Sequence, residues 1–226
     1  MTLFKQPSFS RPLIIILVVL IGACSQMSEL QVIQESGQSW DMRQQQLANI
    51  NEWDIHARLV ILLEDKVYPV GINWIRQHEY SSMVIEAPFG QGVIRIESNV
   101  SIDEKKQFKL TLADGKYHFG ATPEVLLVNL LGWSIPVNSL KSWVKGVPDP
   151  NVDFNYETYG SGRLKLLSQN GWSVNYLEYF SEQKQRQQLP KRLYLKHDNM
   201  ALKIVIERWE KFKKIVNTES IFLNFD

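Results

Sequence analysis

The stretch WDIHARLVIL, residues 53–62, alternates apolar and polar side chains with a period of two. Its apolar residues, Trp53, Ile55, Ala57, Leu59 and Ile61, fall on one side of an extended chain, because successive side chains of a strand point to opposite faces. An amphipathic helix would need a period of 3.6 residues. The stretch therefore predicts a half-buried strand of an antiparallel sheet.

The same alternation recurs along most of the chain, for example in QFKLTL (107–112) and WSVNY (172–176). Asp114-Gly115 and Asn170-Gly171 have the composition of two-residue hairpin turns, in which both central positions need a positive φ. Candidate strands begin at Trp53, Val67, Tyr80, Gln91, Gln107, Lys116, Val152, Arg163, Trp172, Lys191 and Ala201. We therefore predict a mainly β domain of about eleven antiparallel strands, in a sandwich or barrel.

A first helix is predicted just before these strands, over residues 40–53. Ser39 suits its N-cap, since a serine hydroxyl accepts a hydrogen bond from a free backbone N–H of the first turn. Trp40, Arg43, Leu47 and Ile50 share one face of this helix.

Two further helices interrupt the strands within residues 122–148. Thr122 and Pro123 are a typical N-cap and first helical residue, and Gly132 ends the first of these helices. The second is predicted over residues 137–145. Both are strongly apolar, so we expect them to cover the mouth or the inside of a curved sheet.

The first 23 residues have the composition of a secretory signal peptide. Lys5 and Arg11 precede an apolar run over residues 13–21, which is shorter than the ~20 residues that span a bilayer. The run leads into LIGAC (20–24), which resembles the bacterial lipoprotein signal. That signal implies lipidation of Cys24 and cleavage just before it, and Ser25 implies sorting to the outer membrane, facing the periplasm. A chance cysteine is the alternative, but a single cysteine has no intrachain partner for a disulfide, which favours lipidation.

The rest of the chain divides into three predicted parts. Residues 24–39 are polar and serve as a flexible tether, whose roughly 15 residues have a typical end-to-end distance of about 20 Å. Residues 40–212 form the folded domain, and residues 213–226 form a C-terminal tail.

Composition and motifs argue against several function classes. The formal net charge is +1, and a nucleic-acid-binding protein would need a basic face. The four histidines, His56, His78, His118 and His197, lack metal-ligand spacing, and no catalytic or phosphate-binding motif is present. We therefore expect no enzyme activity, cofactor or metal site, although a glycosidase pair of acids distant in sequence stays open.

The aromatic residues suggest an apolar ligand. A curved sheet of this size can enclose a cavity, as lipocalin barrels do. Trp74, Trp143 and Trp172 are candidates to line such a cavity. Plain core packing explains these three residues equally well.

Several motifs together resemble one known family. WSIPVNSLKSWVKGVP (133–148) contains the pattern P-x-N-S-L-x-x-W-x-x-G-x-P, and the Asn73-Trp74 pair, the turn APFG and NGWSVNYLEY (170–179) accompany it. In this order and spacing they resemble the LolB family, over about residues 40–212. The resemblance implies an unclosed antiparallel barrel of about eleven strands, with helices covering a hydrophobic cavity.

The resemblance also implies a function. Such a protein accepts triacylated lipoproteins from the periplasmic carrier LolA and inserts them into the inner leaflet of the outer membrane. We expect a monomer with no nucleic-acid partner. A membrane-tethered module for another apolar ligand and a structural adaptor of the outer membrane are the alternatives.

The turn in VIEAPFGQGVI (84–94) places an apolar ring at its tip. Pro88 fixes φ for one turn position and Gly90 relieves the backbone, so Phe89 has little room to fold back. The resemblance implies that this protruding residue acts in membrane insertion, although Phe89 stands where the family usually has leucine. Since single exposed apolar residues are common, Phe89 as an ordinary surface residue is the alternative.

Overall fold

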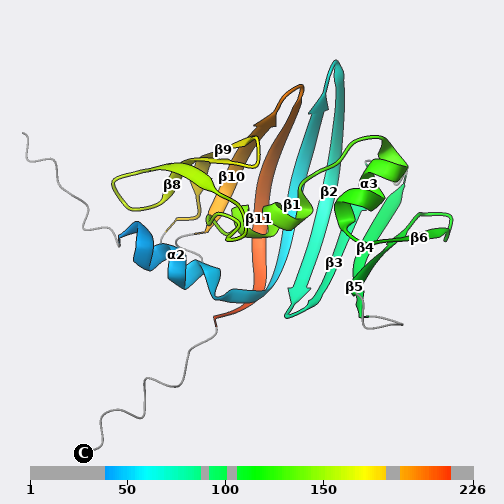
Figure 1. Cartoon of the computed structure of the whole chain (residues 1–226), viewed down its shortest axis with the longest axis horizontal. Coiled ribbons are helices and arrows are strands. Elements are labelled where there is room, and N and C mark those ends of the chain that lie inside the picture. Colours follow the sequence, from blue (N-terminus) through cyan, green and yellow to red (C-terminus); the bar gives the residue numbers. More distant parts are fainter. Residues whose placement is uncertain (1–38, 88–91, 101–105, 182–188, 215–226) are drawn as a thin grey trace, which may run out of the picture. The chain divides into compact units, whose positions relative to one another are not determined.

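A single antiparallel sheet of eleven strands dominates the structure (Figure 1). The computed structural model describes residues 39–87, 92–100, 106–181 and 189–214. The elements are α2 (Trp40–Ala48), β1 (Ile50–Leu63), β2 (Lys66–Gln77), β3 (Tyr80–Glu86), β4 (Val93–Val100), β5 (Lys106–Thr111), β6 (Tyr117–Gly120), α3 (Pro123–Leu131), α4 (Val137–Trp143), β7 (Phe154–Thr158), β8 (Leu164–Gln169), β9 (Trp172–Tyr179), β10 (Pro190–His197) and β11 (Met200–Lys214). None of the described helices has the length and apolar character needed to cross a membrane.

The strand order is β6-β5-β4-β3-β2-β1-β11-β10-β9-β8-β7, so the first and last strands pair in the middle of the sheet. The edge strands are β6 and β7, and no ladder joins them in the described part of the chain. Both α3 and α4 lie in the connection between these edges, and Figure 1 shows α3 in front of the sheet. The prediction of an unclosed, mainly β fold covered by helices is therefore confirmed.

The burial pattern of the central strand β1 confirms the alternation of apolar and polar residues that predicted this strand. Trp53, Ile55, Ala57, Leu59 and Ile61 are all buried on one face. The intervening side chains lie on the opposite, outer face of the sheet. Strand β1 pairs with β2 on one side and β11 on the other, so these five residues form the floor of the core.

The two predicted hairpin turns have different geometries. Asn170 and Gly171 have φ angles of 50° and 76°, as expected for a two-residue turn with two positive φ positions. At the other turn only Gly115 has a positive φ, of 84°. The backbone bond from Leu112 N to Lys116 O closes a three-residue loop there, so the prediction of a two-residue turn was wrong. Three-residue hairpin loops need a single left-handed position, which Gly115 supplies.

Helix α2 is shorter than predicted. Ser39 caps it by accepting a bond from Met42 N, but the helix ends at Ala48 rather than at residue 53. From Ile50 onward the backbone pairs with two neighbouring strands, and these tertiary hydrogen bonds override the local helical pattern. Helix α3 has the predicted cap at Thr122 and ends at Gly132, whereas α4 ends at Trp143, before the predicted residue 145.

Candidate functional site

A wholly apolar cavity lies between the sheet and the two covering helices. Strands β1, β2, β3 and β11 form its floor, and α3, α4 and the segment between them form its roof, with Ala57, Trp74, Met83, Leu127 and Leu140 among its lining residues. The cavity measures about 30 Å³. Ligand pockets usually enclose ~300–1,000 Å³, so this cavity is too small to hold an acyl ligand in the structure. An acyl ligand would enter only if the helices moved away from the sheet.

The structure places the three candidate tryptophans in different surroundings. Trp74 lines the cavity, and its indole N–H donates to Ser81 Oγ at 2.9 Å. Trp143 is 0% exposed and is not among the lining residues. Trp172 borders a separate depression of about 560 Å³ and packs on His197, with ring centroids 5.1 Å apart. Contact of any of them with an acyl chain stays a prediction.

Trp143 fastens α4 to the half of the sheet that contains β8 and β9. Its indole N–H donates to Gln169 Oε1 at 2.7 Å, and its carbonyl accepts from the Tyr176 hydroxyl at 3.1 Å. Gln169 is itself buried and satisfied, because Oε1 also accepts from Asp149 N and Nε2 donates to Asp149 O and Val152 O. We call Trp143, Gln169 and Asp149 the helix latch.

The latch explains Trp143 and Ser139 in the pattern of residues 136–148, and other contacts explain Leu140 and Gly146. Ser139 Oγ donates to Asp149 Oδ2 at 3.0 Å, and Leu140 lines the cavity. Gly146 has a φ of 81°, and a Cβ there would lie 3.2 Å from Pro190 Cγ. Sequence reasoning missed Gln169 and Asp149, which lie outside the pattern. Gln169, a polar residue two positions after Leu167 on β8, was the available signal.

Lys145 is buried beside the latch although it carries an amino group. It is 8% exposed, and Nζ donates to Ala48 O at 3.4 Å and to Ile50 O at 3.1 Å. These bonds tie the end of α2 and the start of β1 to the segment after α4. Burial, with smaller contributions from the charges of Arg76 and Lys141, lowers the pKa of Lys145 to about 8.

The lowered pKa predicts a stability that rises with alkaline pH. Below about pH 8, Lys145 is charged in both the folded and the unfolded protein. Between about pH 8 and pH 10.5, Lys145 keeps its proton in the unfolded chain but has lost it in the folded protein. The free energy of unfolding should therefore increase in this range, relative to Lys145→Met, by on the order of 2–3 kcal/mol. Urea unfolding of both proteins from pH 7 to 10.5 measures this difference. The exposed Lys165→Met is the control, and a pH-independent difference for Lys145→Met would contradict the prediction.

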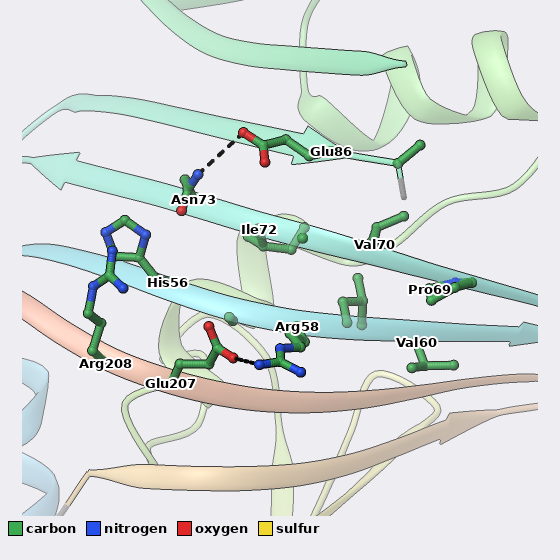
Figure 2. A pocket seen from close by; sticks show the side chains of 14 residues that line it. His56, Arg58, Val60, Pro69, Val70, Ile72, Asn73, Glu86, Glu207 and Arg208 are labelled. Carbon is green, nitrogen blue, oxygen red and sulfur yellow. Dashed lines mark hydrogen bonds and ion pairs between the residues drawn. The ribbon is translucent and has the colours of Figure 1, made fainter. Parts of the chain in front are cut away.

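The outer face of the sheet carries a depression of about 460 Å³, which is lined by residues of β1, β2, β3 and β11 (Figure 2). Arg58 forms an ion pair with Glu207, and Asn73 Nδ2 donates to Glu86 Oε1 at 3.5 Å. These polar groups are satisfied by one another, so we assign no ligand to this depression.

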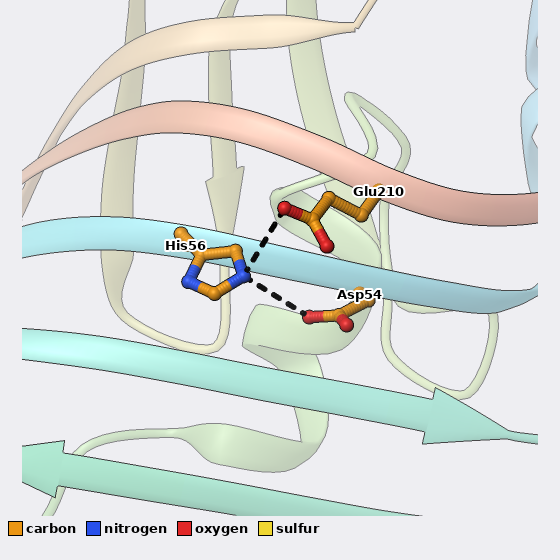
Figure 3. Close-up of side chains that lie close together, drawn as sticks. All are labelled: Asp54, His56 and Glu210. Atoms are coloured by element: carbon orange, nitrogen blue, oxygen red, sulfur yellow. Dashed lines mark ion pairs between the residues drawn. The ribbon is translucent and has the colours of Figure 1, made fainter.

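Asp54, His56 and Glu210 cluster on the same outer face (Figure 3). Strand register brings them together, because Asp54 lies opposite Glu210 and His56 follows two residues later on β1. His56 Nε2 lies 3.8 Å from Asp54 Oδ1 and 3.6 Å from Glu210 Oε1. The same Glu210 oxygen accepts from Arg208 Nε at 2.6 Å, so a cation already neutralises it. We interpret the cluster as an ion-pair network rather than a metal site.

Comparison with known families adds to this geometry. The family model described as outer membrane lipoprotein LolB matches residues 51–209, which include all eleven strands except a few terminal residues and both covering helices. The chain belongs to the LolB family.

Individual relatives agree with the assignment to the LolB family. The outer-membrane lipoprotein LolB of Pseudomonas savastanoi pv. phaseolicola is 28% identical, with 87% of this chain and 94% of the relative covered. LolB of Nitrosococcus oceani is also 28% identical, with 88% and 96% covered. A solved domain from Vibrio parahaemolyticus, described as a putative outer membrane lipoprotein-sorting protein, has 6% identity, a TM-score of 0.43, and 81% and 96% covered. That TM-score is too low to add to the assignment.

Other predicted features of this LolB family member lie outside the described residues. They are the signal peptide, Cys24, the tether before Ser39, the turn residues Pro88, Phe89 and Gly90, and the chain from residue 215 onward. Strand β11 continues to Lys214, beyond the predicted domain boundary at 212.

Proposed function

We propose that this chain accepts triacylated lipoproteins from the periplasmic carrier LolA and inserts them into the outer membrane. The observation that carries the proposal is the wholly apolar cavity under α3 and α4, in a member of the LolB family. Exposing acyl chains to water costs about 0.8 kcal/mol per CH₂, so a lipoprotein in the periplasm needs an apolar site at each step.

The small cavity suits a receptor that opens only for its cargo. An open apolar cavity of acyl size would expose its lining to water, whereas here Leu127 and Leu140 rest against the sheet. Opening costs apolar contacts, and the acyl chains restore them when they enter. Since the sequence has no nucleotide-binding motif, transfer runs downhill from the carrier to this cavity and then to the bilayer.

The predicted ends of the chain complete the proposal. Lipidated Cys24 anchors the protein in the inner leaflet of the outer membrane, and residues 24–39 let the domain move at the surface. Phe89 contacts the lipid and assists release. The domain acts as a monomer, with no enzyme activity, cofactor, metal or nucleic-acid partner.

The test is a transfer assay with the full chain reconstituted in liposomes and LolA that carries an acylated lipoprotein. The lipoprotein should move from LolA into the liposomes only when the chain is present. Trp74→Ala should weaken acyl capture by on the order of 1–3 kcal/mol, because it removes apolar area from the cavity wall. Tyr117→Ala is the control, since this aromatic ring is exposed on the edge strand β6.

One outcome would contradict the proposal, and another would correct the role of a single residue. Binding of free lipid without transfer from LolA would support a module for another apolar ligand. Equal capture by Trp74→Ala and the parent protein would remove this residue from the acyl site.

A further inference from the structure

On the inner face of the sheet, a row of apolar side chains across four neighbouring strands lies next to a row that is mostly polar. Strand register aligns Trp74, Met83, Ile96 and Leu110 in one row across β2, β3, β4 and β5, and all four are buried. The neighbouring row on the same face, two residues away on each strand and nearer to the β2–β3 turn, consists of Arg76, Ser81, Ser98 and Phe108. The apolar row therefore ends at a row with three polar side chains.

The polar row lines a second cavity, of about 170 Å³, which we call the vestibule. Trp74, Met83 and Val137 line both the vestibule and the apolar cavity, so the two spaces adjoin. Besides these, the vestibule is lined by Arg76, Glu79, Ser81, Phe108, Asn138 and Lys141, among others. Helix α4 follows the same gradient, with Leu140 at the cavity and Lys141 at the vestibule.

The described lining of the vestibule includes two cationic side chains and one acidic side chain. Arg76 and Lys141 are the cationic residues, and Glu79 is the acidic one. Both cations also lie within electrostatic range of Lys145, whose pKa they help to lower. Partial burial lowers the pKa of Arg76 from its ordinary value, and the negative charge of Glu79 opposes part of this shift.

We propose that the vestibule binds the polar head of the acylated cargo, with Arg76 and Lys141 donating to its ester and amide carbonyl oxygens while the acyl chains occupy the adjoining cavity. This inference rests on the proposed function. A carbonyl that leaves water without a new donor costs free energy, and these two side chains offer donors and no acceptor. Trp74 stands at the boundary between head and chains, with its ring in the cavity wall and its N–H bonded to Ser81.

The arrangement also fixes the direction of the cargo. The vestibule lies towards the turn between β2 and β3, which contains Glu79. The loop over residues 88–91 joins the opposite ends of β3 and β4. The acyl chains therefore extend from the vestibule towards the strand ends that carry this loop.

Site-specific photo-crosslinking of the full chain in the cell envelope tests the proposal. A diazirine side chain is placed at Phe108 in the vestibule, at Ile85 in the cavity wall, or at the exposed Leu177 as a control. Mass spectrometry then locates the cross-linked atoms. Phe108 should react with the acylated cysteine of a lipoprotein or with the residues that follow it. Ile85 should react with acyl chains, and Leu177 should yield no lipoprotein.

Different results separate this inference from the proposed function. Suppose that Ile85 reacts with acyl chains, but Phe108 reacts with no lipoprotein, with acyl-chain methylenes alone, or with phospholipid. In each of these cases the vestibule assignment is wrong and the proposed function stands. If neither position yields lipoprotein, both fail.

A charge variant provides a second readout. The double variant Arg76→Gln and Lys141→Gln should lower lipoprotein cross-linking at Ile85 roughly tenfold, because neutral amide donors bond carbonyl oxygens more weakly than charged donors do. Lys165→Gln is the matched control, since that side chain is 55% exposed on β8 and pairs with Glu157. The melting temperature confirms that each variant is folded. Equal cross-linking by the double variant and Lys165→Gln would overturn the proposal.

Discussion

Replacing Trp143 with alanine should lower the free energy of unfolding by about 3–5 kcal/mol, the usual cost of deleting a large buried aromatic side chain. The indole is completely buried, and its N–H is one of the two donors to Gln169 Oε1. The change would both leave a void under α4 and break the helix latch. The roof of the cavity would then lose its main polar attachment to β8.

Trp143→Phe separates these two effects. It keeps most of the ring and removes the N–H, while Gln169 Oε1 still accepts from Asp149 N, so a loss of about 1–2 kcal/mol is expected. Denaturant unfolding with a fixed m-value measures both changes. An unchanged midpoint for Trp143→Ala would show that Trp143 does not hold α4 in place.

Phe89→Glu should reduce delivery of lipoprotein into liposomes at least tenfold while capture from LolA stays unchanged. A carboxylate is costly to transfer into hydrocarbon, whereas a phenyl ring enters it readily. In the proposed function, capture depends on the apolar cavity under α3 and α4, whereas Phe89 acts at the later step of insertion into the membrane. The two steps should therefore respond separately.

The assay needs Cys24→Ala in every protein, so that the lipid anchor cannot compensate for the loop. Phe89→Leu is the matched control and should deliver nearly as well as the parent protein, since leucine is similarly apolar. Equal delivery by Phe89→Glu and its parent would make Phe89 an ordinary surface residue.

The fold could be predicted because its strongest signals are local. The alternation in β1 assigns its buried face without any knowledge of its neighbours. The caps at Thr122 and Gly132 likewise bound α3 correctly. The prediction failed for residues 49–53, where pairing with β2 and β11 decides the structure. No local pattern reveals these distant partners.

The site was harder to predict because it depends on strand register. Trp74, Trp143 and Trp172 all belong to apolar faces in the sequence, and only the packed structure shows that Trp74 alone lines the cavity. Arg76 lies two residues from Trp74 and so shares its face, but nothing in β2 alone aligns it with Ser81 or Lys141. Gln169 gained its role only through contacts with a segment about 20 residues away.

The pairing of β1 with β11 also governs how this chain folds. The two longest strands, β1 and β11, are the first and last strands along the chain, and they pair at the centre of the sheet. Contacts between residues so distant in sequence slow folding, because the chain loses conformational entropy on closing the long loop before the contacts stabilise it. The central ladder cannot form until β11 has been synthesised. A chain truncated before Met200 would leave one whole side of β1 without a partner, an open edge prone to aggregation.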